Sequence, residues 1–258
     1  MIGDARAQRG EVPFGDGDAR RHLDVTATQM VWRDQDTICV MIRDVTARHA
    51  EAERNRHLAW HDQLTGLPNR TAFQDRLRGA LAEAAVRGEV LGVAFVDVDQ
   101  FKNVNDIVGH DVADRLLVDV ATRLREGVRG GDVVARQGGD EFLLLLPNLG
   151  RRADAAGLAE RVLAVFRSPF VVEGREIQLT ASIGIAVYPD DGRDAAELVK
   201  HADMAMFQAK EAGRDGWQLY DSAMRERTAR LVETRTRLTH ALERGEFLLH
   251  YQPQVDLR

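Results

Sequence analysis

Four carboxylates follow apolar runs at two places in the chain. Asp97 and Asp99 end the run "VLGVAFVDVD", and Asp140 and Glu141 lie between "VVARQGG" and "FLLLL". The apolar runs predict buried strands. If these strands are neighbours in one sheet, the carboxylates meet at one of its edges. Carboxylate oxygens suit hard divalent cations such as Mg²⁺, which bridge and neutralise phosphate oxygens in nucleotidyl transfer. The pattern is typical of a nucleoside triphosphate site.

Two other interpretations apply to these acids when they are taken alone. An Asp-Glu pair at a hairpin tip can be a solvated turn, for which Gly138 and Gly139 supply the tight backbone geometry. The segment "DVDQFKNVNDIVGHD" also begins like an EF-hand loop. Phe101 and Lys102 occupy the fifth and sixth positions, where that loop requires a ligand and a glycine. The spacing excludes the EF-hand and leaves the solvated turn open.

The segments around the acids alternate between helical and strand patterns. Strands are expected at 90–98, 133–137, 141–147, 177–189 and 217–220, and helices at 72–88, 114–128, 153–166 and 195–213. Asn69 or Thr71 is a suitable cap for the first helix, which stops at Gly88. Interleaved strands and helices with one tight hairpin predict an α+β fold, an α/β sandwich whose central mixed β-sheet is flanked by helices.

The two ends of the chain have weaker patterns. Residues 1–22 are rich in Gly, Asp and Arg and predict a loop, whereas 22–46 alternates around a polar turn as a β-hairpin does. Residues 46–62 predict a solvated helix. After Tyr220 we expect a charged helix and one apolar strand.

Composition excludes several classes of protein. The 258 residues are 44% hydrophobic, enough for a packed core, and the net charge of −6 argues against a nucleic-acid surface. The single cysteine, Cys39, cannot form an internal disulfide, which favours a reducing, cytoplasmic location. We expect no membrane segment, because no apolar stretch approaches the length needed to span a bilayer.

Four separated motifs together resemble the GGDEF family of diguanylate cyclases, which condense two GTP into cyclic di-GMP. They are "DQLTGLPNR" (62–70), "DVDQFKNVNDIVGHDVAD" (97–114), "RQGGDEF" (136–142) and "ADMAMFQAKEAGRDG" (202–216). The resemblance implies a palm-like nucleotidyl-cyclase fold. It also implies that Asp97, the backbone carbonyl of Val98 and Asp140 hold Mg²⁺ or Mn²⁺. Asp140 and Glu141 are the implied catalytic acids.

The resemblance further implies a set of positions that bind GTP. They are Phe101, Lys102, Asn105, Asp114, Gly138, Gly139, Lys210 and Arg214. Asn105 and Asp114 match the positions that read guanine, since an amide and a carboxylate can pair with its donor and acceptor edges. Phe101 and Lys102 match a loop over the phosphates.

Two further sites bear basic residues. Lys210 and Arg214 are expected one helical turn apart, facing the β- and γ-phosphates together. "RGGD" lies upstream of the signature loop and resembles the family's R-x-x-D site, at which Arg129 and Asp132 would bind cyclic di-GMP and inhibit the enzyme. An ordinary polar turn is the alternative for this segment.

The flanks resemble parts of other domains. Residues 1–45 resemble the C-terminal strands of a PAS sensor domain, 46–60 a helical linker, 61–221 the GGDEF domain, and 222–258 a linker helix with the truncated start of an EAL phosphodiesterase domain. We therefore expect a fragment of a PAS-GGDEF-EAL signalling protein.

The resemblance implies an active diguanylate cyclase with product feedback inhibition. Each domain would hold one GTP, so a homodimer is needed for catalysis. The alternative functions are a GTP-binding regulatory module that controls an adjacent EAL domain, and a cyclic di-GMP receptor that acts through Arg129 and Asp132.

Overall fold

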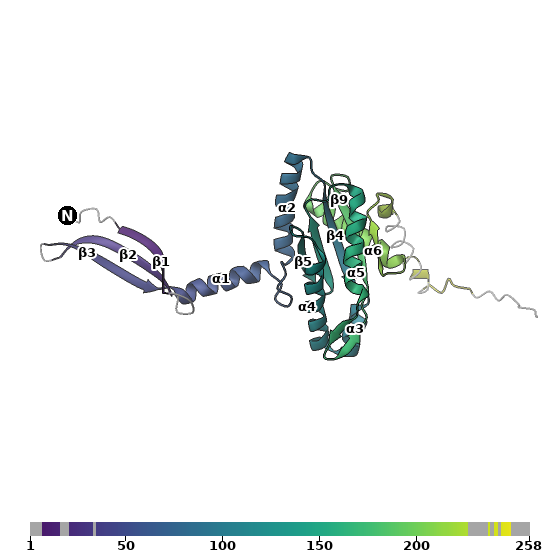
Figure 1. Cartoon of the computed structure of the whole chain (residues 1–258), viewed down its shortest axis with the longest axis horizontal. Helices are drawn as coiled ribbons and strands as arrows, with labels where there is room; N and C mark the ends of the chain where they lie inside the picture. Colours follow the sequence, from purple (N-terminus) through teal and green to yellow (C-terminus); the bar gives the residue numbers. More distant parts are fainter. Residues whose placement is uncertain are drawn as a thin grey trace, which may run out of the picture. The chain divides into compact units, whose positions relative to one another are not determined.

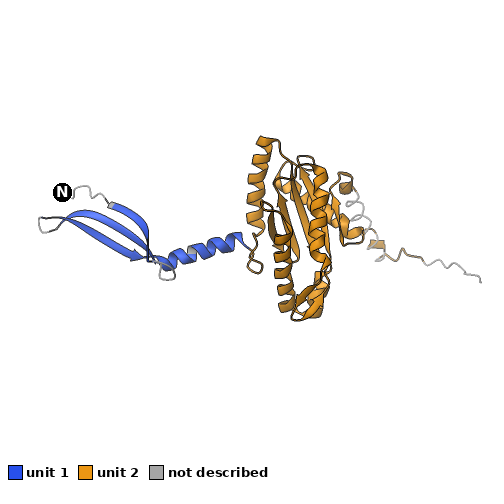
Figure 2. Ribbon diagram, in the orientation of Figure 1, with its two compact units in different colours: residues 1–61 blue, residues 62–258 orange. Residues whose placement is uncertain are grey.

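The computed structural model describes residues 7–15, 21–32, 35–226, 237, 240–241 and 244–248. The chain divides into two compact units, Met1–His61 and Asp62–Arg258 (Figure 2). Within the described residues, no helix is long and apolar enough to cross a membrane.

The first unit is an antiparallel sheet followed by a helix (Figure 1). Its elements are β1 (Ala7–Phe14), β2 (Arg21–Trp32), β3 (Gln35–Asp44) and α1 (Thr46–Trp60). The predicted hairpin and helix are confirmed. The prediction of a loop through residues 1–22 was wrong for β1, which pairs along its whole length with β2. Gly10 and Pro13 are unfavourable inside most strands, which is why the sequence predicted a loop. An edge strand such as β1 tolerates both residues.

The second unit contains a five-stranded sheet in the order β10-β9-β4-β6-β5. Its elements are α2 (Arg70–Arg87), β4 (Leu91–Val98), α3 (Phe101–Val108), α4 (His110–Gly127), β5 (Val133–Gly138), β6 (Glu141–Leu146), a 3₁₀ helix (Arg152–Asp154), α5 (Ala155–Arg167), β7 (Phe170–Val172), β8 (Arg175–Ile177), β9 (Ala181–Tyr188), α6 (Ala195–Glu211) and β10 (Gly216–Leu219). The central strand β4 is antiparallel to β6 and β9, whereas β10 is parallel to β9. The α+β fold with a mixed sheet is confirmed.

Local sequence explains where the first helix of this unit begins and ends. The Asn69 side chain accepts a hydrogen bond from the backbone N–H of Ala72 and so caps α2. Gly88 ends the helix at φ 66°, a left-handed conformation that favours glycine. The predicted boundaries of α2 are confirmed to within two residues.

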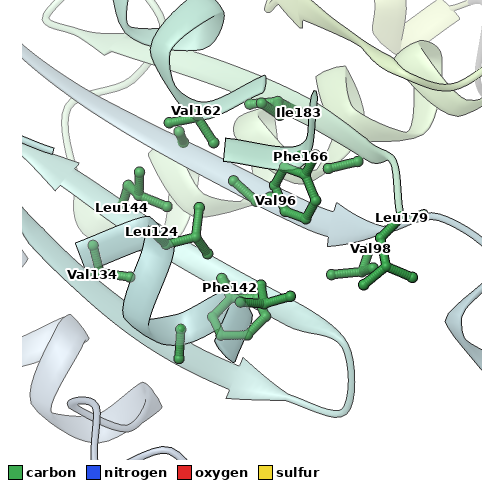
Figure 3. Close-up of a cluster of buried hydrophobic side chains, with 14 of the residues drawn as sticks. Val96, Val98, Leu124, Val134, Phe142, Leu144, Val162, Phe166, Leu179 and Ile183 are labelled. Atoms are coloured by element: carbon green, nitrogen blue, oxygen red, sulfur yellow. The ribbon is translucent and has the colours of Figure 1, made fainter. Parts of the chain in front are cut away.

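Helices cover both faces of the central sheet. Residues of α4 and α5 pack on one face together with Val96 and Val98 of β4 (Figure 3). Residues of α2 and α6 pack on the other face with Phe95. Since successive side chains of a strand point to opposite faces, Asp97 shares the face of Phe95 and points toward α6.

A glycine lets α6 lie close against the sheet. A Cβ atom on Gly184 of β9 would lie 2.0 Å from the backbone oxygen of Ala202 and 2.0 Å from the backbone nitrogen of Met206. Any larger residue must displace the helix. Gly184 therefore fixes how close the α6 side chains lie to the end of β4.

Several elements differ from the sequence prediction. The helix α3 and the small β7–β8 hairpin were not expected, and α4 begins at His110, four residues before the predicted start. The strand predicted at 177–189 is regular only over Ala181–Tyr188. The helix and strand predicted after Tyr220 lie largely outside the described residues.

Candidate active site

Strand pairing brings the acids of the two apolar runs together. β4 pairs with β6, and the register sets Asp97 directly opposite Glu141. The backbone N–H of Val98 donates to the carbonyl of Asp140 over 3.1 Å. Asp140 itself lies in the turn between β5 and β6. The expectation that the two runs are neighbouring strands is confirmed, and the carboxylate that faces Asp97 across the ladder is that of Glu141.

The buried Asp97 is only partly neutralised. Its Oδ2 lies 2.6 Å from the Nζ of Lys210, which reaches it from α6. Burial raises the pKa of Asp97 above its ordinary value; the Lys210 ammonium opposes this shift, and the charges of Asp140 and Asp99 add to it. The site therefore favours additional positive charge.

Glu141 is in a similar environment. Partial burial raises the pKa of Glu141, and so does repulsion from Asp97, Asp203 and Asp140. Asp203 lies on α6 and was not singled out from the sequence. It precedes Lys210 by seven residues, which places both on one face of the helix. The spacing indicates a shared helix face, but only the packing of α6 on the sheet places that face beside the acids.

Asp99 has a different environment from Asp97. Its carboxylate accepts hydrogen bonds of 2.7 Å from the hydroxyls of both Thr180 and Ser182. A third bond, of 3.1 Å, comes from the backbone N–H of Asp215. These bonds tie the end of β4 to β9 and to the turn after α6. Asp99 therefore acts as a structural acid. It is not part of the acidic edge, which we define as Asp97, Asp140, Glu141 and Asp203.

Arg136 fixes the turn that carries Asp140. Its Nε and Nη2 donate to the carbonyl of Gly139 over 3.0 and 2.7 Å, and its Nη1 lies 2.9 Å from Oδ1 of Asp62. Gly139 has a φ of 56°, the left-handed conformation that the turn requires. Partial burial opposes ionisation of Asp62, but hydrogen bonds from Thr65 and Arg136 hold its pKa below the ordinary value.

Helices α3 and α4 carry four of the residues expected to bind GTP. Asn105 is half-buried on α3, and its Oδ1 is buried without a hydrogen-bond donor. Asp114 is exposed on α4. Phe101 and Lys102 begin α3, so the expectation of a loop there was wrong. The Phe101 side chain packs in the core, where it is 7% exposed, because it occupies the apolar face of an amphipathic helix.

Lys210 and Arg214 are not one helical turn apart. The helix α6 ends at Glu211, and Arg214 follows in a left-handed turn with φ 65°. Gly213 allows the chain to leave the helix at this point. The Arg214 side chain is exposed. The expected spacing was wrong because it assumed a longer helix.

The "RGGD" segment forms a closed turn beside a cavity. The Asp132 carboxylate accepts a hydrogen bond of 2.9 Å from the backbone N–H of Arg129. Both residues line a cavity of about 350 Å³, to which α5 contributes Arg161. The Nε of Arg161 is buried without a hydrogen-bond partner. Two arginines and two carboxylates, Asp132 and Asp154, line this cavity, which therefore offers both cations and hydrogen-bond acceptors.

The acidic edge fits a hard divalent cation that is completed by substrate. No preformed group of three or more His, Cys, Asp or Glu metal ligands exists among the described residues. Mg²⁺ is usually held by one or two carboxylates together with waters and substrate phosphates. Asp97 and Glu141 face each other with raised pKa values, so oxygen donors and excess negative charge are both present.

The fold and this site define an α+β domain with an acidic edge on its central mixed sheet. The family model described as "Diguanylate cyclase, GGDEF domain" matches residues 59–216. This match covers more than half of the 258 residues. The chain belongs to the GGDEF domain family, which is related to the diguanylate cyclases.

Individual relatives agree with this assignment. The chain is 44% identical over 198 residues to the bifunctional diguanylate cyclase/cyclic di-GMP phosphodiesterase MucR of Pseudomonas aeruginosa, covering 77% of this chain and 29% of MucR. The solved GGDEF domain of TpbB, also called YfiN, from P. aeruginosa is 40% identical with a TM-score of 0.64, covering 66% of this chain and 99% of that domain.

A second solved structure contains the family's product. The coiled coil and GGDEF domain of DgcB from Caulobacter crescentus, in complex with c-di-GMP, is 28% identical with a TM-score of 0.60. The match covers 68% of this chain and 93% of that one. The chain spans only 26% to 32% of the length of the first four curated relatives.

Proposed function

We propose that the domain is a diguanylate cyclase that condenses two GTP into cyclic di-GMP and pyrophosphate. The observation that carries this proposal is the facing pair of the buried Asp97 and the half-buried Glu141 at the sheet edge, with Lys210 bound to Asp97. Structural acids are normally satisfied by hydrogen bonds, as Asp99 is. An underneutralised pair is costly, and such sites cluster where ligands bind.

The proposed cation ligands are Asp97, the Val98 carbonyl, Asp140 and Glu141. When bound there, Mg²⁺ or Mn²⁺ supplies the neutralisation of phosphate charge that nucleotidyl transfer needs. The register adds Glu141 to the ligands that the sequence indicated. Lys210 then leaves Asp97 and pairs with the phosphates of GTP.

The remaining residues orient the nucleotide. Arg214, exposed beyond α6, contacts the phosphates together with Lys210. Lys102, exposed at the start of α3, is proposed to contact the phosphates together with the backbone there. The unused Oδ1 of Asn105 accepts from guanine, and Asp114 accepts from its other N–H groups. Gly138 and Gly139 leave room for the ligand, since a Cβ atom built on either meets nothing within 4 Å.

The reaction requires two copies of the domain. The 3′-oxygen of one GTP attacks the α-phosphorus of the other, and pyrophosphate leaves. One domain holds one GTP, so the two active sites must face each other in a homodimer. GTP is a cytoplasmic nucleotide, and we place the domain in the cytoplasm.

Product inhibition is proposed at the "RGGD" turn. Arg129, Asp132 and the adjacent cavity with Arg161 offer cations and a carboxylate for the phosphates and guanines of cyclic di-GMP. Arg129→Ala should leave the initial rate unchanged and raise the inhibition constant for added cyclic di-GMP at least about tenfold. An unchanged inhibition constant would count against this site.

Two non-catalytic functions compete with this proposal. In the first, the domain is a GTP-binding regulatory module that controls an adjacent EAL domain. In the second, it is a cyclic di-GMP receptor. The relative MucR, a bifunctional diguanylate cyclase/cyclic di-GMP phosphodiesterase, makes the first worth testing. The acids at the sheet edge favour the enzyme over the receptor, because a receptor that acts through Arg129 and Asp132 does not need an edge that binds a cation.

Incubation of the purified chain with GTP and Mg²⁺, followed by chromatography, separates these functions. We expect cyclic di-GMP and pyrophosphate, formed at a rate per protomer that rises with protein concentration as dimers form. Binding of GTP without any product at high protein concentration would support the regulatory module. Binding of cyclic di-GMP alone would support the receptor.

A further inference from the structure

A cavity of about 360 Å³ adjoins the acidic edge on the face of the sheet covered by α2 and α6. We call it the α2/α6 cavity. It is lined by Arg70 from the start of α2, Gln137 from β5, Glu141 from β6, and Lys200 and Asp203 from α6. The residues assigned above to guanine lie on α3 and α4 and are not among its lining residues. The cavity is therefore a separate compartment that shares one wall, Glu141, with the site already described.

The lining residues have unused binding capacity. Arg70 and Lys200 are exposed cations, and neither forms an ion pair within the described part of the chain. The Oε1 atom of Gln137 is buried and has no hydrogen-bond donor. A buried acceptor without a partner is costly unless a ligand or water donates to it. Two free cations with one free acceptor match a ligand that carries both a phosphate and hydroxyl groups.

The course of α6 separates this cavity, beside the first half of the helix, from Lys210 near its end. β4 lies between β9 and β6, and Lys210 approaches Asp97 from α6, which packs mainly over β9. The cavity is lined from α2, β4, β5 and β6 and from the first half of α6, up to Asp203, whereas Lys210 lies seven residues further along that helix. In phosphoryl transfer the attacking and leaving oxygens lie roughly in line on opposite sides of phosphorus. If pyrophosphate leaves toward Lys210, the nucleophile must arrive from the side of the α2/α6 cavity.

We propose that the α2/α6 cavity receives the ribose 3′ end of the attacking GTP, which is carried by the second copy of the domain. This inference rests on the proposed cyclase function. Gln137 accepts a hydrogen bond from a ribose hydroxyl, and Arg70 and Lys200 pair with the α-phosphate of the same nucleotide. The residues position the attacking nucleotide and do not hold the one under attack.

The step positioned in this way is balanced. A bond forms between the ribose 3′-oxygen and the α-phosphorus, and the bond from that phosphorus to the bridging oxygen of pyrophosphate breaks. Pyrophosphate leaves with the electron pair. The hydroxyl proton passes to water beside the exposed Asp203. No oxidant, reductant or further reactant is needed.

The test compares the double variant Arg70→Ala/Lys200→Ala with Arg76→Ala/Arg193→Ala. The control pair removes the same charge from exposed positions outside the cavity. The probe is 3′-deoxy-GTP with Mg²⁺, which binds but cannot react. Three readouts are needed: the affinity of each variant for the probe, the probe-dependent dimerisation measured by sedimentation, and the rate with GTP at equal dimer concentration.

We expect the cavity variant to bind 3′-deoxy-GTP as the wild type does and to dimerise about tenfold more weakly in its presence. Its rate with GTP should fall at least about tenfold at equal dimer concentration, because misplaced nucleophiles react slowly. The control variant should match the wild type in all three measurements.

Equal probe-dependent dimerisation of the cavity variant and the wild type would overturn the inference. A parallel loss of probe affinity would also overturn it, because it would place Arg70 and Lys200 on the nucleotide under attack. Suppose instead that the wild type forms no product while the cavity variant still dimerises more weakly than the wild type with the probe. That result would contradict the cyclase function, but the cavity would remain assigned to a partner's nucleotide.

Discussion

Asp97 and Asp99 are separated by one residue, yet they belong to regions of opposite character. The acidic edge, which comprises Asp97, Asp140, Glu141 and Asp203, leaves its charges facing one another with Lys210 as counter-ion. The Asp99 anchor consists of Asp99 with its donors Thr180, Ser182 and the backbone of Asp215, and it is fully hydrogen-bonded. The difference shows that strand position alone does not assign a role to a carboxylate. Its hydrogen-bond partners do.

The largest effect is expected at the acidic edge. Asp97→Asn should lower the rate of cyclic di-GMP formation at least about 100-fold, because a charge that stabilises the transferred phosphate is lost. It should not lower the temperature of unfolding, since the raised pKa of Asp97 means that its charged form costs stability at neutral pH. Initial rates and thermal unfolding of the same preparation check both. A large loss of stability would make Asp97 an anchor like Asp99.

The opposite outcome is expected at the Asp99 anchor. Asp99→Ala should lower the free energy of unfolding by roughly 2–4 kcal/mol, because Thr180, Ser182 and Asp215 lose a charged acceptor. Denaturant unfolding measures this loss. The rate per folded molecule should fall less than in Asp97→Asn. If Asp99→Ala is as stable as the wild type, the distinction between the two regions fails.

A smaller effect is expected where Asp62 holds Arg136. Asp62→Ala should cost about 1 kcal/mol at neutral pH, since solvent partly screens this charged pair. The folded-state pKa of Asp62 lies below its ordinary value of 3.8. Its stabilising contribution is therefore present above that ordinary value and is lost as pH falls through the lowered folded-state pKa.

Urea unfolding of the wild type and Asp62→Ala at pH 7 and at pH 3 tests the Asp62 prediction. The difference between the two proteins should shrink at the lower pH. A difference that stays constant or grows would show that Asp62 acts through something other than its charge.

The sequence predicted the sheet edge but not which acid faces which. Two apolar strands ending in carboxylates were enough to predict that Asp97 and the signature loop meet. The pairing with Glu141 depends on where the hairpin turns. The turn uses Gly139 and Asp140 rather than Gly138 and Gly139, with a register shift between Arg136 and Gly138. A shift of one residue reverses the face of every side chain, and the local sequence permits both turns.

Other differences have equally local causes. Arg214 was expected on a helix, but the chain leaves α6 near Gly213 and takes a left-handed turn that helical periodicity does not reveal. Phe101 was expected in a loop, but it begins α3, where burial of its ring in the core is favourable by roughly 2 kcal/mol. Asp203 was missed because its role depends on the packing of α6 against β9, which Gly184 permits. These features depend on tertiary contacts rather than on local pattern.

The measurement that tests the acidic edge most directly is the initial rate of cyclic di-GMP formation as a function of Mg²⁺ concentration, for the wild type and Glu141→Gln. Glu141 lies opposite Asp97 in the ladder, and the substitution removes its charge with little change of shape. We predict a saturable dependence for the wild type and, for Glu141→Gln, either no product or a requirement for at least about tenfold more Mg²⁺. Identical curves for the two proteins would contradict the assignment of Asp97 and Glu141 as the centre of the active site.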